Sequence, residues 1–220
     1  MTSKRDVEST VEVSLSTRLR EAHRQVTRQR ISDAAREIFH RDGYRDARLE
    51  EVAQLAGLSR STLYQHFGDK ESILTEVAEP YRLGLLALVE EMPGPNPTRN
   101  EIDVWIARLA RFVATERVPT ILIVELANGE DSPAPLQQIG SDLLTALANR
   151  YPAFSRALQD GPERTLWRAW ADTILREMGW ACLRYARDEG AASVAALQVA
   201  ADLIYLFVHE KFRWRDEDVC

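Results

Sequence analysis

The chain has 220 residues, of which 45% are hydrophobic and 28% charged, and its formal net charge at pH 7 is −6. This length allows one large or two modest domains with a sizeable core. The negative net charge excludes a protein that coats nucleic acid with its whole surface. The two cysteines, Cys182 and Cys220, exclude a disulfide framework or a cysteine-rich metal site.

Charge is distributed unevenly along the chain. Residues 1–45 hold ten Lys/Arg and seven Asp/Glu, a net charge of +3, and the remainder carries −9. A positive head on an acidic body is typical of a protein that presents one end to DNA while the body is repelled by phosphates. No signal peptide opens the chain, and no apolar run is long enough to span a bilayer. We therefore expect a cytoplasmic protein without membrane contact.

Residues 1–16 are polar, with a brief alternation of apolar and polar side chains. A single short strand would have no partner, so we expect a mobile tail. The alternative is that Lys4 and Arg5 form an arm that follows a DNA groove.

The first helix is predicted over residues 17–41. Its inward face is apolar at Ile31, Ala34, Ala35, Ile38 and Phe39. Arg28 and Arg30 lie on its N-terminal side, where we expect solvated charges, with phosphate contact as the alternative.

Residues 49–73 contain two short helical patterns joined by a tight turn. The first pattern places apolar side chains on one face at Leu49, Val52, Ala53 and Ala56. Gly57 can take the left-handed conformation that ends a helix, and Ser59 is a good N-cap for the next one. The second pattern directs Leu63 and Phe67 inward. This arrangement is typical of a helix-turn-helix, in which the second helix enters the DNA major groove.

An ordinary helical hairpin would show the same periodicity, so the exposed side chains decide between the two interpretations. Donors suited to phosphate oxygens recur on the outer face, at Arg60, Thr62, Tyr64, His66 and Lys70. Ser61 and Gln65 add short polar groups suited to base edges. A hairpin that only had to be soluble would more often carry mixed Glu and Lys there, which favours the helix-turn-helix.

The N-terminal part of the sequence resembles the TetR family of transcriptional regulators. The matching residues are Thr27-Arg28-Gln29-Arg30-Ile31, Ala34-Ala35, Phe39, Gly43-Tyr44, Val52-Ala53, Ala56-Gly57-Leu58-Ser59, Thr62-Leu63-Tyr64-Gln65-His66-Phe67 and Lys70-Glu71-Ser72-Ile73-Leu74. They cover roughly a fifth to a quarter of the chain, and so many spaced matches are far more specific than a three-residue motif.

The resemblance implies a role for each polar residue of the second helix. Phosphate contacts would come from Thr62, Tyr64, His66 and Lys70, and base contacts from Arg60, Ser61 and Gln65. The chain departs from the family at Ala47-Arg48, where the family usually has a threonine. Arg48 would supply a longer, charged phosphate contact in place of that hydroxyl, and Asp46 would take over the capping role.

The sequence divides into a tail (1–16), a helix-turn-helix domain (17–68) and a helical body (69–220). A connecting helix is predicted over residues 69–91, with Asp69 as its N-cap, and Pro80 should kink or break it. The loop of residues 92–98 contains three prolines and marks a boundary. Further helices are predicted at about 100–117, 119–128, 136–150, 162–188 and 192–213, with a weaker turn at 152–158.

The last two predicted helices are apolar on more than one face, which requires burial on more than one side. A central core helix would explain this, and so would a dimer face in which two copies form a four-helix bundle. The resemblance favours the second explanation, because such regulators usually dimerise through their last two helices. A two-fold dimer would suit a pseudo-palindromic operator on double-stranded DNA.

The resemblance also implies a small-molecule effector that binds among the C-terminal helices. The candidate pocket residues form an apolar and aromatic set, namely Trp105, Phe112, Phe154, Trp170, Ile174, Met178 and Tyr185. Taken alone, each of these residues is better explained by plain core packing. The polar groups considered for orienting a ligand are Glu125, Asn128, Gln138 and Asp172. The composition of the set favours an apolar or aromatic effector.

The sequence thus predicts an all-α, ligand-responsive, dimeric DNA-binding repressor with an N-terminal three-helix head and a C-terminal ligand-binding and dimerisation domain. The alternative is an interaction protein whose body docks another protein while DNA serves as the address. An enzyme is not expected. The four histidines are scattered, and the chain shows no metal-ligand spacing, glycine-rich phosphate loop or nucleophile motif. Accordingly, neither a metal nor a cofactor is predicted.

Overall fold

The computed structural model describes the backbone of residues 4–129 and 131–210, and the side chains within these ranges from residue 17 onward. Every regular element in these ranges is a helix, which confirms the predicted all-α fold. The chain forms two compact units, the first ending at Val77 and the second beginning at Ala78. This boundary lies inside a helix, whereas the sequence placed it at residue 69.

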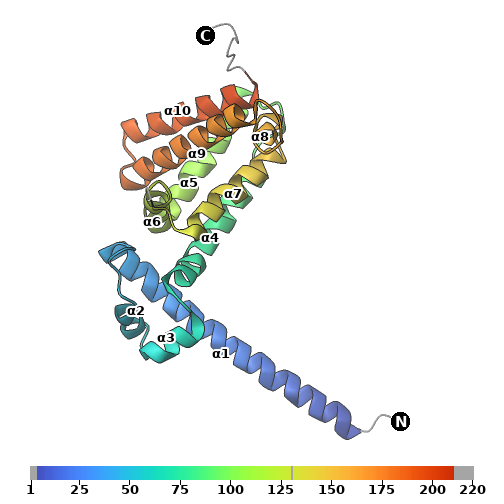
Figure 1. Ribbon diagram of the computed structural model, residues 1–220, viewed down its shortest axis with the longest axis vertical. Helices are drawn as coiled ribbons and strands as arrows, with labels where there is room; N and C mark the ends of the chain where they lie inside the picture. Colours follow the sequence, from blue (N-terminus) through green and yellow to red (C-terminus); the bar gives the residue numbers. More distant parts are fainter. Residues whose placement is uncertain (1–3, 130, 211–220) are drawn as a thin grey trace. The chain divides into compact units, whose positions relative to one another are not determined.

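The first unit, called the head below, contains α1 (Lys4–Asp42), α2 (Leu49–Leu55), α3 (Arg60–His66) and the start of α4 (Lys70–Glu90) (Figure 1). Helix α2 packs against α1, and α3 packs against both. The core of the unit is formed by fully buried apolar side chains at Ile31, Ala35, Val52, Leu63, Ile73 and Leu74. These include the periodic positions that predicted the inward faces of the helices.

Helix α1 begins at Lys4 rather than near Thr17, so residues 4–16 continue the helix where a tail was expected. The physical reason is that residues 4–42 contain neither glycine nor proline, and nothing in that stretch ends a helix. The side chains of Lys4 and Arg5, the alternative DNA arm, lie outside the described residues, as does Cys220.

Helix α4 starts as predicted and continues through its proline. The Ser72 backbone N–H donates to Asp69 Oδ1 at 2.7 Å, so Asp69 caps the first turn. Pro80 lies within the helix and does not break it.

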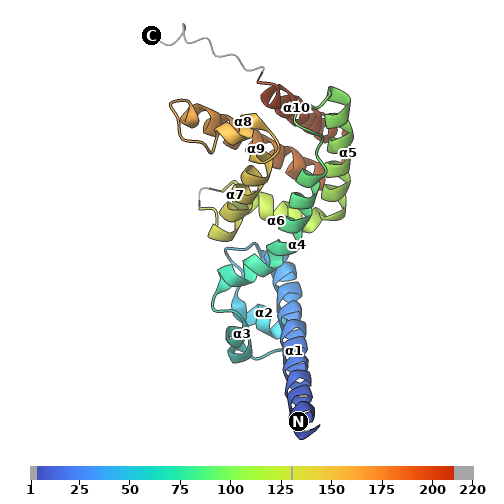
Figure 2. The same cartoon turned by 90° about the vertical axis from the view of Figure 1, so that its right-hand side faces the viewer.

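The second unit consists of the rest of α4 and six further helices (Figure 2). They are α5 (Arg99–Thr115), α6 (Arg117–Ala127), α7 (Ala134–Ala148), α8 (Pro152–Arg156), α9 (Arg164–Arg187) and α10 (Ala191–Val208). Helix α9 is central, because α5, α6, α8 and α10 all pack against it. At one end of the core, the Phe154 and Phe207 rings meet edge to face with centroids 4.8 Å apart.

Helix α10 corrects the expectation that no apolar run of the chain is long enough to span a bilayer. Its 18 residues have a mean hydropathy of 1.8, so this helix is long and apolar enough to cross a membrane by length and composition alone. In the structure α10 packs against α5, α8 and α9, so its apolar face contributes to the core of the second unit. A core helix of a folded protein can have the same length and apolar composition as a membrane span, because both must bury apolar side chains.

Two helical glycines provide a test of packing between α4 and α5. A Cβ on Gly84 would lie 2.5 Å from Phe112 Cε2, whereas a Cβ on Gly140 would meet nothing within 4 Å. We expect Gly84→Ala to lower the free energy of unfolding by about 1–3 kcal/mol through overpacking. Gly140→Ala should raise it by about 0.5–1 kcal/mol, because alanine restricts the unfolded chain. Urea unfolding of both variants would check these signs, and a gain in stability for both would contradict the packing.

Candidate nucleic-acid interface and cavity

The turn between α2 and α3 is set by two backbone hydrogen bonds. The Leu58 N–H donates to the Ala53 carbonyl at 2.9 Å, and the Gly57 N–H donates to the Gln54 carbonyl at 3.0 Å. These are the paired bonds of a Schellman motif, which requires a left-handed residue after the helix, and Gly57 has φ +67°. The Ser59 hydroxyl then accepts from the Thr62 N–H at 3.1 Å and caps α3, as the sequence predicted.

Arg30 of α1 fixes the end of α2. Its Nη2 donates to the Ala56 carbonyl, one of the carbonyls left without a partner inside the helix. A Cβ on Gly57 would lie only 2.9 Å from the same nitrogen. Glycine is therefore favoured at this position both by its backbone conformation and by the close approach of Arg30.

Arg28, two residues before Arg30 on α1, fixes the end of α3. Its Nη1 donates to the His66 carbonyl at 2.9 Å, and its Nη2 pairs with Glu76 of α4 at 2.5 Å. The guanidinium also lies 4.2 Å from the centre of the Phe67 ring. Arg28 and Arg30 were expected to be solvated charges. This expectation is wrong for Arg28, which is half-buried, whereas Arg30 remains exposed although one of its nitrogens binds a carbonyl. Both arginines hold helix ends of the head in place.

The outer face of α3 is polar and exposed. Arg60, Ser61, Tyr64 and Gln65 are exposed, while Leu63 of the same helix is completely buried. The two remaining predicted contacts on this helix, Thr62 and His66, are half-buried. The buried residue anchors the helix, so the four exposed side chains form one accessible strip on a fixed support.

The exposed strip is organised by local contacts. Arg60 Nη1 pairs with Glu50 of α2 at 2.8 Å, and its guanidinium lies 5.6 Å from the Tyr64 ring centre. Hydrogen bonding to Tyr64 and the nearby Glu50 charge raise the pKa of Arg60 above its ordinary value, so it stays charged. The Ser61 hydroxyl lies 2.8 Å from that of Ser59.

Two of the predicted phosphate-binding cations have partners within the head. Arg48 is exposed and pairs with Glu51, and it occupies the N-cap position of α2 without forming a side-chain cap. Asp46, expected to cap this helix, is not the N-cap residue. Lys70 Nζ donates to the Arg45 carbonyl at 2.8 Å, and burial lowers the pKa of Lys70.

His66 is a poor cation in this environment. Burial of the imidazole is the main cause that lowers its pKa from the ordinary value of 6.5, and the positive charges of Arg24 and Arg28 lower it further. Its Nδ1 is buried without a hydrogen-bond partner among the described residues. The imidazole is thus neutral near pH 7. In this form it can donate one hydrogen bond to a phosphate but carries no charge.

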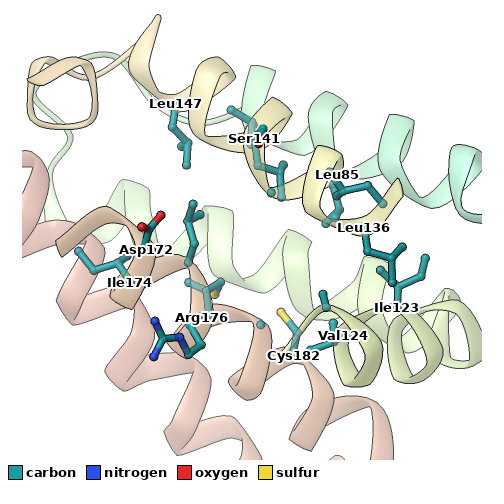
Figure 3. Close-up of a pocket in the computed structure, with 18 of the residues that line it drawn as sticks. Leu85, Ile123, Val124, Leu136, Ser141, Leu147, Asp172, Ile174, Arg176 and Cys182 are labelled. Atoms are coloured by element: carbon teal, nitrogen blue, oxygen red, sulfur yellow. The ribbon is translucent and has the colours of Figure 1, made fainter. Parts of the chain in front are cut away.

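The second unit contains a cavity of about 570 Å³ that is lined by residues from α4 to α10. Its wall is mostly apolar, and Figure 3 shows Leu85, Ile123, Leu136 and Leu147 from three different helices around it. Cys182 is also in the wall, and burial raises the pKa of its thiol to about 12, so the thiol is neutral. Small-molecule sites in proteins commonly have this size and character.

The candidate pocket residues divide into two groups. Trp105, Phe154, Ile174 and Met178 line the cavity. Phe112, Trp170 and Tyr185 are not among its lining residues and pack as partly buried side chains against the core. The sequence could not separate the groups, because wall and core positions share the same helical period.

Arg168 and Arg176 were not among the candidates from the sequence, whereas Asp172 was one of the polar groups considered there. All three charged residues line the cavity. They lie on α9, and their spacing of four residues places them along one face of the helix. This spacing was visible in the sequence. It was indistinguishable from an ordinary solvated helix surface.

Comparison with known proteins gives a match over the head. The family model for bacterial regulatory proteins of the tetR family matches residues 31–77. The HTH-type transcriptional regulator SrpR of Pseudomonas putida is 45% identical over 56 residues, which are 26% of each chain. The HTH-type transcriptional regulator AlkX of Mycobacterium tuberculosis is 29% identical over 141 residues, covering 61% of this chain and 65% of AlkX. The match therefore spans only about a quarter of the length of SrpR.

Solved structures extend the similarity of fold to the second unit. A tetR family transcription regulator from Shewanella sp. PV-4 has a TM-score of 0.61 at 12% identity, covering 81% of this chain and 95% of that one. FadR of Thermus thermophilus, a TetR family repressor solved with lauroyl-CoA, has a TM-score of 0.51 at 20% identity, covering 88% and 98%. At these identities the likeness concerns the fold alone.

The contacts of Arg28 predict that lysine cannot replace it. Lysine keeps the charge but lacks the planar fork that reaches a carbonyl and a carboxylate together. We expect Arg28→Lys to lower the free energy of unfolding by about 1–2 kcal/mol. Urea unfolding followed by circular dichroism would measure this loss. Arg20→Lys, at an exposed position of the same helix, is the control, and equal effects of the two changes would contradict the role of Arg28.

The lowered pKa of His66 predicts a dependence of stability on pH. Because the folded chain holds the His66 proton less tightly than the unfolded chain, protonation favours unfolding. The stability linked to the neutral imidazole is complete above the ordinary pKa of 6.5 and is lost as the pH falls through the lowered value. Between pH 8 and pH 5.5, the urea midpoint should therefore fall further for the wild type than for His66→Gln. His40→Gln, which removes an exposed imidazole from α1, is the control. Equal falls for the wild type and His66→Gln would contradict the prediction.

Proposed function

We propose that the chain is a dimeric, ligand-responsive transcriptional repressor of the TetR family in the bacterial cytoplasm, because the family model for bacterial regulatory proteins of the tetR family matches residues 31–77. The observation that carries the proposal is the strip of Arg60, Ser61, Tyr64 and Gln65. These exposed polar side chains lie on a short helix that is anchored by the buried Leu63. A recognition helix requires this combination, because base reading depends on side chains held in a fixed register.

We assign two kinds of DNA contact to the head, following the roles that the resemblance to the family implies. Arg60, Ser61 and Gln65 reach base edges in the major groove, with Arg60 suited to the paired acceptors of guanine. Thr62, Tyr64, His66, Lys70 and Arg48 contact phosphates and fix the register. Arg60 is paired with Glu50 when no DNA is bound, and a DNA base would replace Glu50 as its partner.

Dimerisation through α9 and α10 is supported by their unburied apolar side chains. Leu166 and Trp180 on α9 are 44% and 41% exposed, and Val194 and Val199 on α10 are 50% and 58% exposed. Apolar side chains that remain exposed on two packed helices are typical of a protein interface. In a two-fold dimer the two α3 helices would read half-sites about 34 Å apart, or a multiple of this distance.

The effector site is the cavity of the second unit. Helix α4 supplies part of its wall, and the same helix begins in the head. A ligand that moves α4 would change how the head is presented to DNA. Among the structural relatives, FadR of Thermus thermophilus was solved with lauroyl-CoA, which supports an organic effector.

The experiment that tests the proposal is recovery of bound sequences from fragmented genomic DNA of the source organism, with the salt dependence of the best fragment measured alongside. One short pseudo-palindrome among the retained fragments would establish a specific regulator. Weak retention of all fragments that vanishes with salt would contradict the proposal and favour a body that docks another protein.

Variants of the head separate base contacts from phosphate contacts on that operator. Arg60→Ala should cost about 1–3 kcal/mol of discrimination at one base pair. Lys70→Ala should weaken binding to all sequences alike and reduce the salt slope by about 1. Arg111→Ala, which removes an exposed arginine from the second unit, is the control for lost charge. A change of base preference without loss of affinity in Lys70→Ala would show that the roles are wrongly assigned.

A further inference from the structure

We propose that the cavity takes an amphipathic anion, a single apolar chain that ends in a carboxylate, and that Arg176 binds its charged head. This inference rests on the proposed function, since it names the chemical class of the effector. It differs from the sequence prediction, which favoured an apolar or aromatic molecule without a defined charge.

The cavity has an apolar, buried end. Ile123, Val124 and Cys182 are all less than 9% exposed and line this end together with Leu136 (Figure 3). None of these four side chains carries a charge. A ligand group that enters this region gains by leaving water only if it is apolar, because a polar group would lose its hydrogen bonds to water.

The opposite end is charged and reaches solvent. Asp172 and Arg176, both from α9, lie on the side of the cavity opposite Ile123 and Val124 (Figure 3). Arg176 is exposed, and Asp172 is partly exposed. The cavity is thus polarised along its length, with apolar walls inside and charge at its solvent side.

The charge that remains available at this side is positive. Arg168 Nε donates to both carboxylate oxygens of Asp172, at 2.9 and 3.0 Å, so these two charges neutralise each other. Arg176 has no ion pair among the described residues. Its guanidinium can therefore form a two-pronged hydrogen bond with a carboxylate, the geometry for which arginine is best suited.

The volume limits the size of the ligand. At roughly 30 Å³ for each non-hydrogen atom, a cavity of about 570 Å³ has room for fewer than twenty such atoms. A medium-chain carboxylate such as decanoate satisfies this limit. A ligand with two long chains or several fused rings and a bulky head would exceed it.

The test compares decanoate with 1-decanol by isothermal titration calorimetry on the full chain without DNA. The two molecules share the same apolar chain and differ in the charge of the head. We expect the wild type to bind decanoate about three- to tenfold more tightly than decanol, the range for a partly exposed charge-assisted hydrogen bond. Arg176→Gln should remove this preference by weakening decanoate alone.

Two control variants locate the effect. Arg184→Gln removes another arginine of α9 that does not line the cavity, and it should keep the preference for decanoate. Ser141→Trp places a large side chain in the cavity wall and should weaken both ligands alike. Equal binding of both ligands by the wild type would overturn the proposal, and so would a preference that survives Arg176→Gln. Tighter binding of decyltrimethylammonium than of decanoate would overturn it by showing that Asp172 dominates.

Because no DNA is present in this experiment, its result is independent of operator recognition. A protein that recovers a pseudo-palindrome but ignores decanoate retains the proposed function and loses this inference. A protein that binds decanoate through Arg176 but recovers no operator retains the ligand site and loses the regulatory role.

Discussion

The structure of the head depends on two arginines of α1 that satisfy the carbonyl ends of the next two helices. Helices α2 and α3 have seven residues each, which is too short to be stable alone. Arg30 binds the end of α2 and Arg28 binds the end of α3, where it also contacts Phe67 and Glu76. The position of the exposed strip on α3 thus follows from contacts on its opposite, buried side.

Helix α4 connects this head to the cavity. Its first turn is capped by Asp69 in the first unit, and Tyr81, Leu85 and Leu88 line the cavity in the second. The boundary between the units falls at Val77, three residues before Pro80. Proline removes one backbone hydrogen bond from a helix, so this part of α4 resists bending less than the rest. A ligand in the cavity would therefore act on the same helix that carries the head.

The second unit uses apolar surface for three purposes that look alike in sequence. Val113 and Phe207 fill the core, Ile123 and Val124 line the cavity, and Val194 and Val199 remain exposed on α10. The charged face of α9 distinguishes the cavity from the core. Arg168 neutralises Asp172, so Arg176 leaves one positive charge next to an apolar wall. That combination is the physical basis for expecting an amphipathic anion.

The sequence alone determined most of the helices, the turn at Gly57, the caps at Ser59 and Asp69 and the outward polar face of α3, because these features depend on residues close together in the chain. It also predicted Trp105, Phe154, Ile174 and Met178 as pocket candidates, but in a set that included core residues. Only the tertiary structure decided which apolar residues face the cavity, that Arg28 and Arg30 hold helix ends, and that Arg176 is left without an ion pair among the described residues. Each of these depends on partners far apart in sequence, and helical periodicity gives the direction of a side chain without identifying what it meets.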